Sequence, residues 1–232
     1  MSDYNRSEEA NESFKEKRKV KNPIKFNIQL NEEQKLAKEI ALDNTVTAIR
    51  GRSGSGKSLL AANIALDLLF RREVEKVIIT RPTVVAGEDI GFLPGDINQK
   101  LAPFTAPVYE NMYRLYDRIK IEKCVEDGLI EIVPVAFMRG RNFTNSLVIA
   151  DEAQNLTDNQ TELLLTRLCE GSRLLFCGDS AQIDLQDKRR SGFEFMCKHM
   201  HDIQGFRIIH LQKSHRHEIV DSILDVYKNF RN

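Results

Sequence analysis

The sequence of 232 residues has no tryptophan, few prolines and only four cysteines, and its formal net charge is zero. No C-x-x-C pair occurs among Cys124, Cys169, Cys177 and Cys197, which argues against a disulfide framework or a structural zinc site and predicts reduced thiols. Because neither charge is in excess, the chain as a whole does not attract nucleic acid. Such a contact would require a local basic surface.

Long hydrophobic runs are also missing. No run approaches the roughly 18 uncharged residues of a membrane helix, and residues 1–11 lack the apolar stretch of a signal peptide. We therefore expect a cytoplasmic protein without membrane contact. The hydrophobic fraction of 41% and the charged fraction of 29% are close to ordinary globular values, which excludes a fibrous or wholly disordered chain.

The length favours one large domain that follows a tail. Residues 1–22 are polar and highly charged and are predicted to form a flexible tail, and residues 23–232 are predicted to form the domain. The tail contains a basic cluster of Lys15, Lys17, Arg18, Lys19 and Lys21. A solvated tail is one interpretation, and an arm that contacts RNA or a partner is the other.

The domain alternates short apolar runs with helical patterns, which indicates an α/β fold. Six apolar runs are predicted strands, at residues 46–50, 77–80, 129–133, 147–150, 174–177 and 206–209. The runs at 147–150 and 174–177 are hydrophobic throughout, as in strands that are covered on both faces. Apolar residues at helical intervals predict a short helix after Asn31 and another at residues 59–70. We therefore expect a mainly parallel central sheet flanked by helices.

A glycine-rich run at residues 51–58 matches the pattern G-x-x-x-x-G-K-[ST] between a predicted strand and a predicted helix. In this pattern, glycines let backbone N–H groups turn toward phosphate oxygens, and the positive end of the helix faces the same phosphates. Lys57 would add a positive charge and Ser58 a magnesium ligand. A flexible linker is the alternative, which the flanking strand and helix disfavour. The predicted phosphate site consists of Gly51, Arg52, Ser53, Gly54, Ser55, Gly56, Lys57, Ser58 and Leu59.

Two carboxylates follow the apolar run at residues 147–150. Asp151 stands where ATPases hold Mg²⁺, here through its water shell, and Glu152 stands where they polarise the attacking water. Alone, such a pair is equally typical of a strand that meets solvent. Together with the phosphate loop, the catalytic interpretation is favoured.

A polar loop follows the run at residues 174–177 and contains Asp179 and Gln182. These side chains are predicted at the carboxyl edge of the sheet, where open α/β sheets bind ligands. Gln182 is a candidate sensor of the γ-phosphate or of the attacking water. The alternative is an ordinary glutamine in a turn.

Several longer runs resemble the PhoH family. They are residues 80–82, 87–96, 137–141, 151–155, 178–185, 191–192 and 216–217. The resemblance covers nearly the whole chain from about residue 31, and the runs at 151–154 and 178–182 are also similar to motifs of superfamily-one helicases. Ser214 and His215 depart from the family, which has apolar residues there. No segment resembles the nuclease domain of some relatives, which argues against RNA cleavage by this chain.

The resemblance implies a three-layer RecA-like P-loop NTPase of the ASCE class, which uses ATP and Mg²⁺. It also implies RNA-related, helicase-like activity and a part in phosphate-starvation responses. Three functions remain open: an ATPase stimulated by RNA or another single-stranded nucleic acid, an ATPase that acts on protein partners, and a nucleotide-gated assembly module without turnover. A kinase would need a second pocket, and a GTPase would need an N-K-x-D motif, which is absent.

Arg216 is the candidate arginine finger. A single module leaves the outer side of the γ-phosphate open, so a neighbouring subunit could supply this charge, and a homo-oligomer such as a ring is predicted. A surface arginine in a salt bridge is the alternative. Arg81, Arg139 and Arg141 are rival fingers or candidate contacts to an RNA backbone.

Gln34 precedes the first strand by one helix, at the place where helicase-like ATPases use a glutamine to recognise the adenine edge. A solvated helix glutamine is the alternative. Four histidines gather late in the chain, at His199, His201, His215 and His217. Their spacing matches no common zinc motif, so packed or exposed imidazoles are expected.

Overall fold

A computed structural model describes residues 24–82 and 97–217 together with residues 219, 220, 222, 223, 226 and 230. The predicted tail at residues 1–22 and the run at residues 87–96 lie outside the described residues. Within the described part of the chain, no helix has the combination of length and apolar character that crossing a membrane requires.

Six strands form one sheet in which every neighbouring pair is parallel. The strands are β1 (Val46–Gly51), β2 (Lys76–Thr80), β3 (Ile130–Ile132), β4 (Ser146–Ala150), β5 (Arg173–Gly178) and β6 (Phe206–Leu211). Their order across the sheet is β3-β2-β4-β5-β1-β6. All six predicted strands are therefore present. Because the strands are parallel, the loops that follow them gather at one edge of the sheet.

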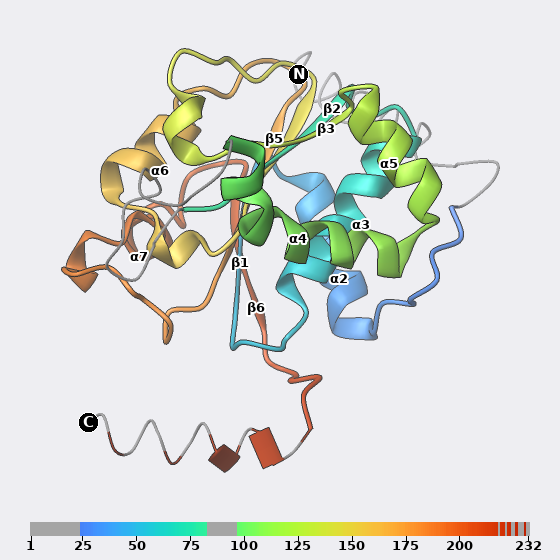
Figure 1. The fold of residues 1–232 in the computed structure, drawn as a ribbon. Helices are drawn as coiled ribbons and strands as arrows, with labels where there is room; N and C mark the ends of the chain where they lie inside the picture. Colours follow the sequence, from blue (N-terminus) through green and yellow to red (C-terminus); the bar gives the residue numbers. More distant parts are fainter. Residues whose placement is uncertain are drawn as a thin grey trace, which may run out of the picture.

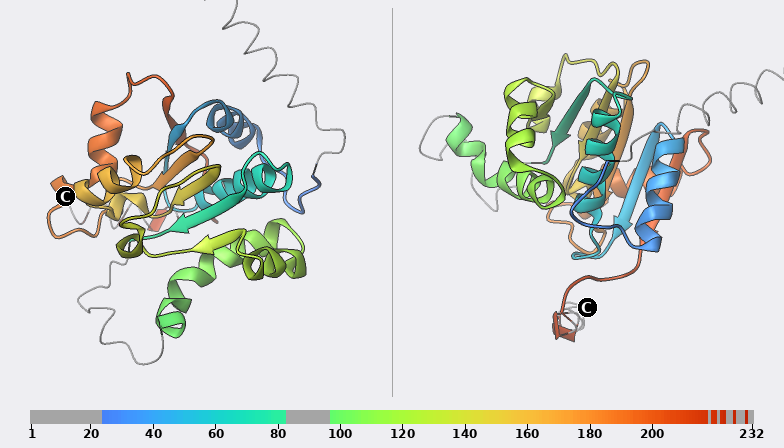
Figure 2. Two further views of the ribbon diagram at one scale, coloured as in Figure 1. Left: turned by 90° about the horizontal axis from the view of Figure 1, so that it is seen from above. Right: turned by 90° about the vertical axis from the view of Figure 1, so that its right-hand side faces the viewer.

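Helices cover both faces of the sheet (Figures 1 and 2). One face carries α2 (Glu32–Asp43), α3 (Lys57–Phe70), α4 (Ile97–Leu115) and α5 (Arg118–Glu126). The other carries α6 (Asp158–Leu165) and α7 (Gly192–His199), together with the short 3₁₀ helices η2 (Val135–Met138) and η3 (Ala153–Asn155). A third 3₁₀ helix, η4, spans Lys188–Arg190.

Successive strand residues enter two separate hydrophobic clusters. In β1, Ile49 belongs to the cluster under α3, whereas Ala48 belongs to the cluster under α6 and α7. In β5, Leu175 and Phe176 divide in the same way. Both faces of the central strands are thus buried, which explains their continuous hydrophobicity. The fold is the expected three-layer RecA-like α/β architecture.

Polar residues fix where the helices begin. Asn31 caps α2 in a reciprocal capping box with Gln34, as its place before the helical pattern predicted. Thr157 and Gln160 form the same arrangement at α6. Helix α3 begins at Lys57, two residues before the predicted start, because its first turn is polar and hydrophobic periodicity does not detect such a turn.

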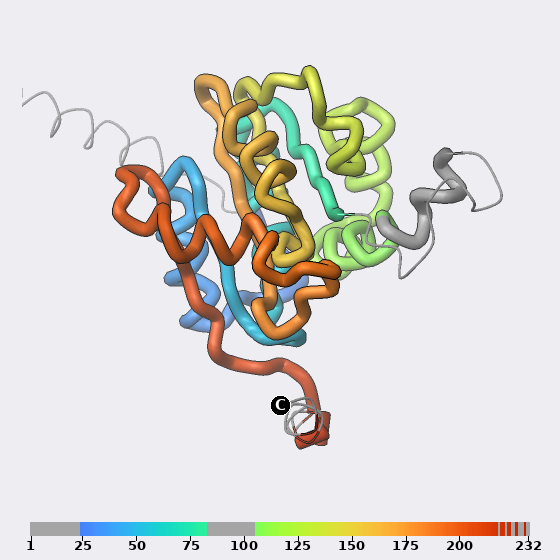
Figure 3. Tube along the Cα trace, turned by 90° about the vertical axis from the view of Figure 1, so that its left-hand side faces the viewer, coloured from blue at the N-terminus to red at the C-terminus, as the bar shows by residue number. Residues whose placement is uncertain are grey.

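The chain leaves the sheet after β6. Residues 212–217 pass beside the loop that follows β1, and His215 donates a backbone hydrogen bond to the Gly54 carbonyl (3.0 Å). Figure 3 shows this segment running from the end of β6 away from the helical layers. The segment at residues 212–217 therefore meets the loop at the carboxyl edge of β1.

Phe143 is a test of the cluster under α6 and α7, because its side chain has no exposed surface. We expect Phe143→Ala to lower the free energy of unfolding by about 3–5 kcal/mol, since the buried ring is replaced by a cavity. Phe195→Ala, at an aromatic residue that is 52% exposed, should cost less than about 1 kcal/mol. Urea denaturation measures both values. Equal losses for the two variants would contradict this description of the core.

Candidate functional site

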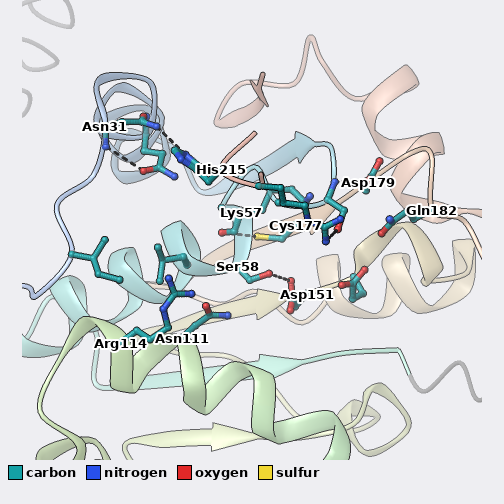
Figure 4. Close-up of a pocket in the computed structure, with 18 of the residues that line it drawn as sticks. Asn31, Lys57, Ser58, Asn111, Arg114, Asp151, Cys177, Asp179, Gln182 and His215 are labelled. Carbon is teal, nitrogen blue, oxygen red and sulfur yellow. Dashed lines mark hydrogen bonds between the residues drawn. The ribbon is translucent and has the colours of Figure 1, made fainter. Parts of the chain in front are cut away.

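A cavity of about 500 Å³ lies at the carboxyl edge of the sheet (Figure 4). Loops that follow β1, β4 and β5 line it, together with the start of α2 and one side of α4. Most of the predicted site residues meet here: Gln34, Ser53, Gly54, Gly56, Lys57, Ser58, Leu59, Asp151, Glu152, Gln182 and Arg216. Residues far apart in the sequence thus form one concave site.

The loop between β1 and α3 has the backbone of an anion-binding turn. Gly54 (φ 87°) and Gly56 (φ 84°) both adopt the left-handed conformation. Alternation of such glycines with ordinary residues directs backbone N–H groups into one concavity. A Cβ atom at Gly54 would lie 2.6 Å from Arg216 Cγ, and one at Gly56 would lie 2.6 Å from Gln34 Nε2. Both glycines are therefore required by their left-handed conformation, and a side chain at either position would displace the side chain of Arg216 or Gln34.

Lys57 is folded over this loop. Its ammonium donates hydrogen bonds to the carbonyl oxygens of Gly51 (2.7 Å) and Arg52 (3.1 Å). Helix α3 begins at the same residue, so the positive end of its dipole faces the concavity. The predicted phosphate loop is present as one structural unit.

Ser58 and Asp151 meet at the floor of the cavity. The Ser58 hydroxyl donates to Asp151 Oδ1 (2.8 Å), and the Asp151 backbone N–H donates to the Thr80 carbonyl (2.9 Å). Burial raises the pKa of Asp151 and the negative Glu152 adds to this, whereas Arg81, 3.5 Å from Oδ2, acts in the opposite direction. A hydroxyl and a buried carboxylate are oxygen donors of the kind that Mg²⁺ prefers, so the residues fit this ion.

Glu152 lies beside this pair in a left-handed conformation (φ 53°), which is unusual for a residue other than glycine. Its carboxylate accepts hydrogen bonds from Gln154 Nε2 (2.8 Å) and from Arg81 (3.4 Å). The side chain is still 42% exposed and lines the cavity. A strained residue that is held from two sides, as Glu152 is, is a common feature of functional sites.

Gln154 is a site residue that the sequence did not single out. Its side chain is buried, and it donates to Glu152 Oε2 and to the Gln182 carbonyl (3.1 Å) and accepts from the Asp179 N–H (3.0 Å). The Ser191 hydroxyl donates to its backbone carbonyl (2.8 Å). Gln154 therefore joins the loop after β4 to the loop after β5. The only sequence signal was its place in the run at residues 151–155.

The loop after β5 also contacts the phosphate loop. Asp179 Oδ2 accepts the Ser53 N–H (2.7 Å), and Asp179 Oδ1 accepts the Ala181 N–H (3.0 Å). Gln182 is exposed, and its side chain lines the cavity at the end opposite Asn31 (Figure 4). The predicted placement of Asp179 and Gln182 is thus observed, and the hydrogen bonds of Asp179 position the loop.

Arg216 contacts the phosphate loop of its own chain, and its contact with a neighbouring subunit stays a prediction. Its guanidinium donates to the Ser53 hydroxyl (2.6 Å). In the adjacent His215, the ring atom Nε2 lies 3.1 Å from Asn31 Nδ2, and the backbone N–H donates to the Gly54 carbonyl. His215, one of the two residues that depart from the family, therefore forms part of the cavity wall.

The three other candidate arginines do not form one surface. Arg81 lies against Asp151 and Glu152. Arg141 pairs with Glu131 (2.6 Å), which also binds Lys76 (2.5 Å). Arg139 is exposed, and within the described part of the chain its guanidinium makes no hydrogen bond or ion pair.

Further walls of the cavity gave no signal in the sequence. Asn111 and Arg114 come from α4, one helical turn apart, and Ile28 comes from the segment before α2. Cys177 lies in the cavity below Lys57, and burial raises the pKa of its thiol well above the usual value, so this thiol is neutral. The four cysteines are free, and no cluster suited to a metal ion occurs among the described histidines, cysteines and carboxylates.

Comparisons with known proteins agree on a family. A family model described as "PhoH-like protein" matches residues 27–228. A PhoH-like protein of Synechocystis sp. is 41% identical over 189 residues, which cover 81% of this chain and 58% of the relative. A PhoH-like protein of Bacillus subtilis is 40% identical over 179 residues, which cover 76% and 56%. The chain thus spans less than two thirds of the length of these relatives.

Among solved structures, the Pif1 helicase from Candida albicans aligns with 88% of this chain and 44% of its own chain, with 22% identity and a TM-score of 0.48. The family match covers most of the domain, including the phosphate loop, the Asp151–Glu152 pair and the segment with Arg216. The chain belongs to the PhoH-like protein family.

Proposed function

We propose that this chain binds ATP with Mg²⁺ and hydrolyses it, and that nucleic acid, RNA in particular, regulates or uses this hydrolysis. The observation that supports the proposal most directly is the hydrogen bond between Ser58 and Asp151, beside Glu152 and below a loop of left-handed glycines. A candidate metal-ligand hydroxyl of the phosphate-binding loop is therefore bonded to a candidate metal-ligand carboxylate, and the candidate base is the next residue in the chain.

Each residue has one task in this proposal. The loop amides and Lys57 bind the phosphates, and Ser58 and Asp151 hold Mg²⁺, which when bound neutralises charge on the phosphate oxygens. Glu152, oriented by Gln154 and Arg81, polarises the attacking water. Gln182 contacts the γ-phosphate or that water.

The coupling of ATP hydrolysis to nucleic acid is supported by other observations than hydrolysis itself. It follows from the resemblance to the family and to helicase motifs, and the charge of the chain as a whole does not favour it. An ATPase that acts on a protein partner, or a nucleotide-gated assembly module, would use the same pocket. Measuring phosphate release with and without single-stranded RNA and DNA decides among these functions.

We expect Glu152→Gln to lower the rate of phosphate release at least roughly 100-fold, because an amide cannot act as the base. Binding of ATP, measured with a fluorescent analogue, should remain within a few-fold of wild type. Glu162→Gln, at an exposed glutamate on α6, is the matched control and should leave the rate unchanged. Unchanged turnover in Glu152→Gln would contradict the proposed role.

We infer that Arg216 stabilises the transferred phosphate within its own chain, because it already bonds to Ser53 of that chain. Arg216→Ala should then lower turnover by about 1000-fold. Mixing this variant with Lys57→Ala, which keeps Arg216 but loses the loop lysine, should restore nothing. Recovery of activity in the mixture would instead establish the predicted contact between subunits of a homo-oligomer.

Gln34 is held in a way that limits which base it recognises. Its Oε1 accepts the Asn31 N–H (3.2 Å), which fixes the orientation of the amide, and its Nε2 lies against Gly56 at the edge of the cavity. The amide N–H groups are therefore the donors that face a ligand, beside the second lone pair of Oε1. Adenine and guanine both present the acceptor N7, and pyrimidines do not. We infer that Gln34 recognises a purine through N7.

Replacing ATP by 7-deaza-ATP removes that acceptor and should raise KM about five- to tenfold. Gln34→Glu keeps the capping-box acceptor but cannot donate, so this variant should give the same KM for ATP and 7-deaza-ATP. GTP should replace ATP with a similar KM, whereas CTP and UTP should not. A strong preference of the wild type for ATP over GTP would show that Gln34 recognises the adenine amino group instead.

A further inference from the structure

An exposed aromatic residue, Phe137, lies two positions before Arg139, whose guanidinium makes no hydrogen bond or ion pair with the described part of the chain. Phe137 is 56% exposed, although it belongs to η2, whose residues Val135 and Met138 are buried in the cluster under α6 and α7. Arg139 follows η2 directly and is exposed. The buried side chains of Val135 and Met138 thus anchor the short helix η2, and Phe137 and Arg139 face solvent.

The backbone of this turn is fixed. The Phe137 N–H donates to the Pro134 carbonyl (2.9 Å), and the Arg141 N–H donates to the Met138 carbonyl (3.2 Å). Gly140 is left-handed (φ 81°) and has no atom within 4 Å of the place a Cβ would occupy, so it is required for the turn and not for packing. Phe137 and Arg139 are therefore presented from a rigid support.

The ion pair of Arg141 completes the support. Arg141 binds Glu131, and Lys76 binds the other oxygen of the same carboxylate. These contacts hold the pKa of Glu131 below its usual value against the opposing effect of its partial burial. Arg141 is thus attached to β3 and is unavailable for a ligand, whereas Arg139 keeps its charge for one.

We propose that Phe137 and Arg139 form a contact site for single-stranded nucleic acid, in which the ring stacks on a base and the guanidinium binds a phosphate. An exposed aromatic ring next to a cation is the combination that single strands require, because every base has a stacking face and every nucleotide a charge. A folded duplex offers no free base face. The inference rests on the proposed coupling of hydrolysis to nucleic acid.

The position of the turn supports such coupling. Turn η2 follows β3, Arg81 follows the neighbouring β2, and Asp151 follows β4. The Val133 N–H bonds to the Ile79 carbonyl, and the Asp151 N–H bonds to the Thr80 carbonyl. Two strand spacings, about 10 Å, thus separate the end of β3, which leads into the turn, from the end of β4, which leads into the carboxylates. Arg81, in contact with both carboxylates, lies between them.

The test compares a 12-nucleotide oligouridylate with an abasic strand of equal length, by fluorescence anisotropy over a range of salt concentrations. Wild type should bind the oligouridylate about tenfold more tightly than the abasic strand, because stacking needs bases. Phe137→Ala should bind both strands equally, with an unchanged dependence on salt. Arg139→Gln should bind both strands more weakly, and the slope of log K against log salt should fall by about 0.7.

Phe195→Ala is the matched control, because Phe195 is similarly exposed but its ring packs at a tilt of 41° against His199, with the ring centroids 4.8 Å apart. It should bind like wild type, and all variants should retain the basal ATPase rate. If wild type binds the oligouridylate and Phe137→Ala and Arg139→Gln bind it equally well, the site is overturned while nucleic-acid coupling stands. If wild type hydrolyses ATP but binds no strand, the coupling fails and the site with it, as expected if a protein is the partner.

Discussion

The hydrogen bond from Ser58 to Asp151 is the contact on which the site depends. It joins the first turn of α3, directly after the loop of β1, to the end of β4, although β5 lies between these two strands. Such a contact depends on how far each strand extends, and the parallel register sets their relative positions: β4 ends at Ala150, whereas β1 continues past Ala48 to Gly51. Ala48 and Ala150 both pair with Phe176 of β5. The register of the buried strands therefore determines the geometry of the proposed metal ligands.

The strand positions followed from the sequence because each strand is a short apolar run, and burial on both faces requires such a run. The capping box of α2 and the phosphate loop were equally predictable, since their geometry depends on residues within a few positions of one another. The partners of the arginines were not predictable. Arg216 bonds to Ser53 over a separation of 163 residues, and Arg141 to Glu131 over 10 residues through a turn. Local patterns contain no information about such pairs.

Gln154 shows why motif residues are easier to find than their supports. Asp151 and Glu152 are recognisable in the sequence because two charged residues follow an apolar strand, whereas a neutral amide in the next turn produces no comparable pattern. Only the structure shows that Gln154 bonds to groups on three sides. Its burial makes each of these bonds costly to lose, because an unsatisfied amide in the interior is destabilising. The loops after β4 and β5 are therefore expected to move together.

Two residues of the site, Asp151 and Glu152, lower the stability of the fold, and the hydrophobic core around β4 offsets this cost. Burial of the Asp151 carboxylate opposes its charge, and Glu152 occupies a left-handed conformation, which costs about 1–3 kcal/mol. Both residues follow β4, whose five residues are all buried between the two hydrophobic clusters. Because the strand cannot shift without exposing these residues, the strain remains at its end. A bound cation would relieve the charge of Asp151 directly, so ligand binding and stability are linked at this position.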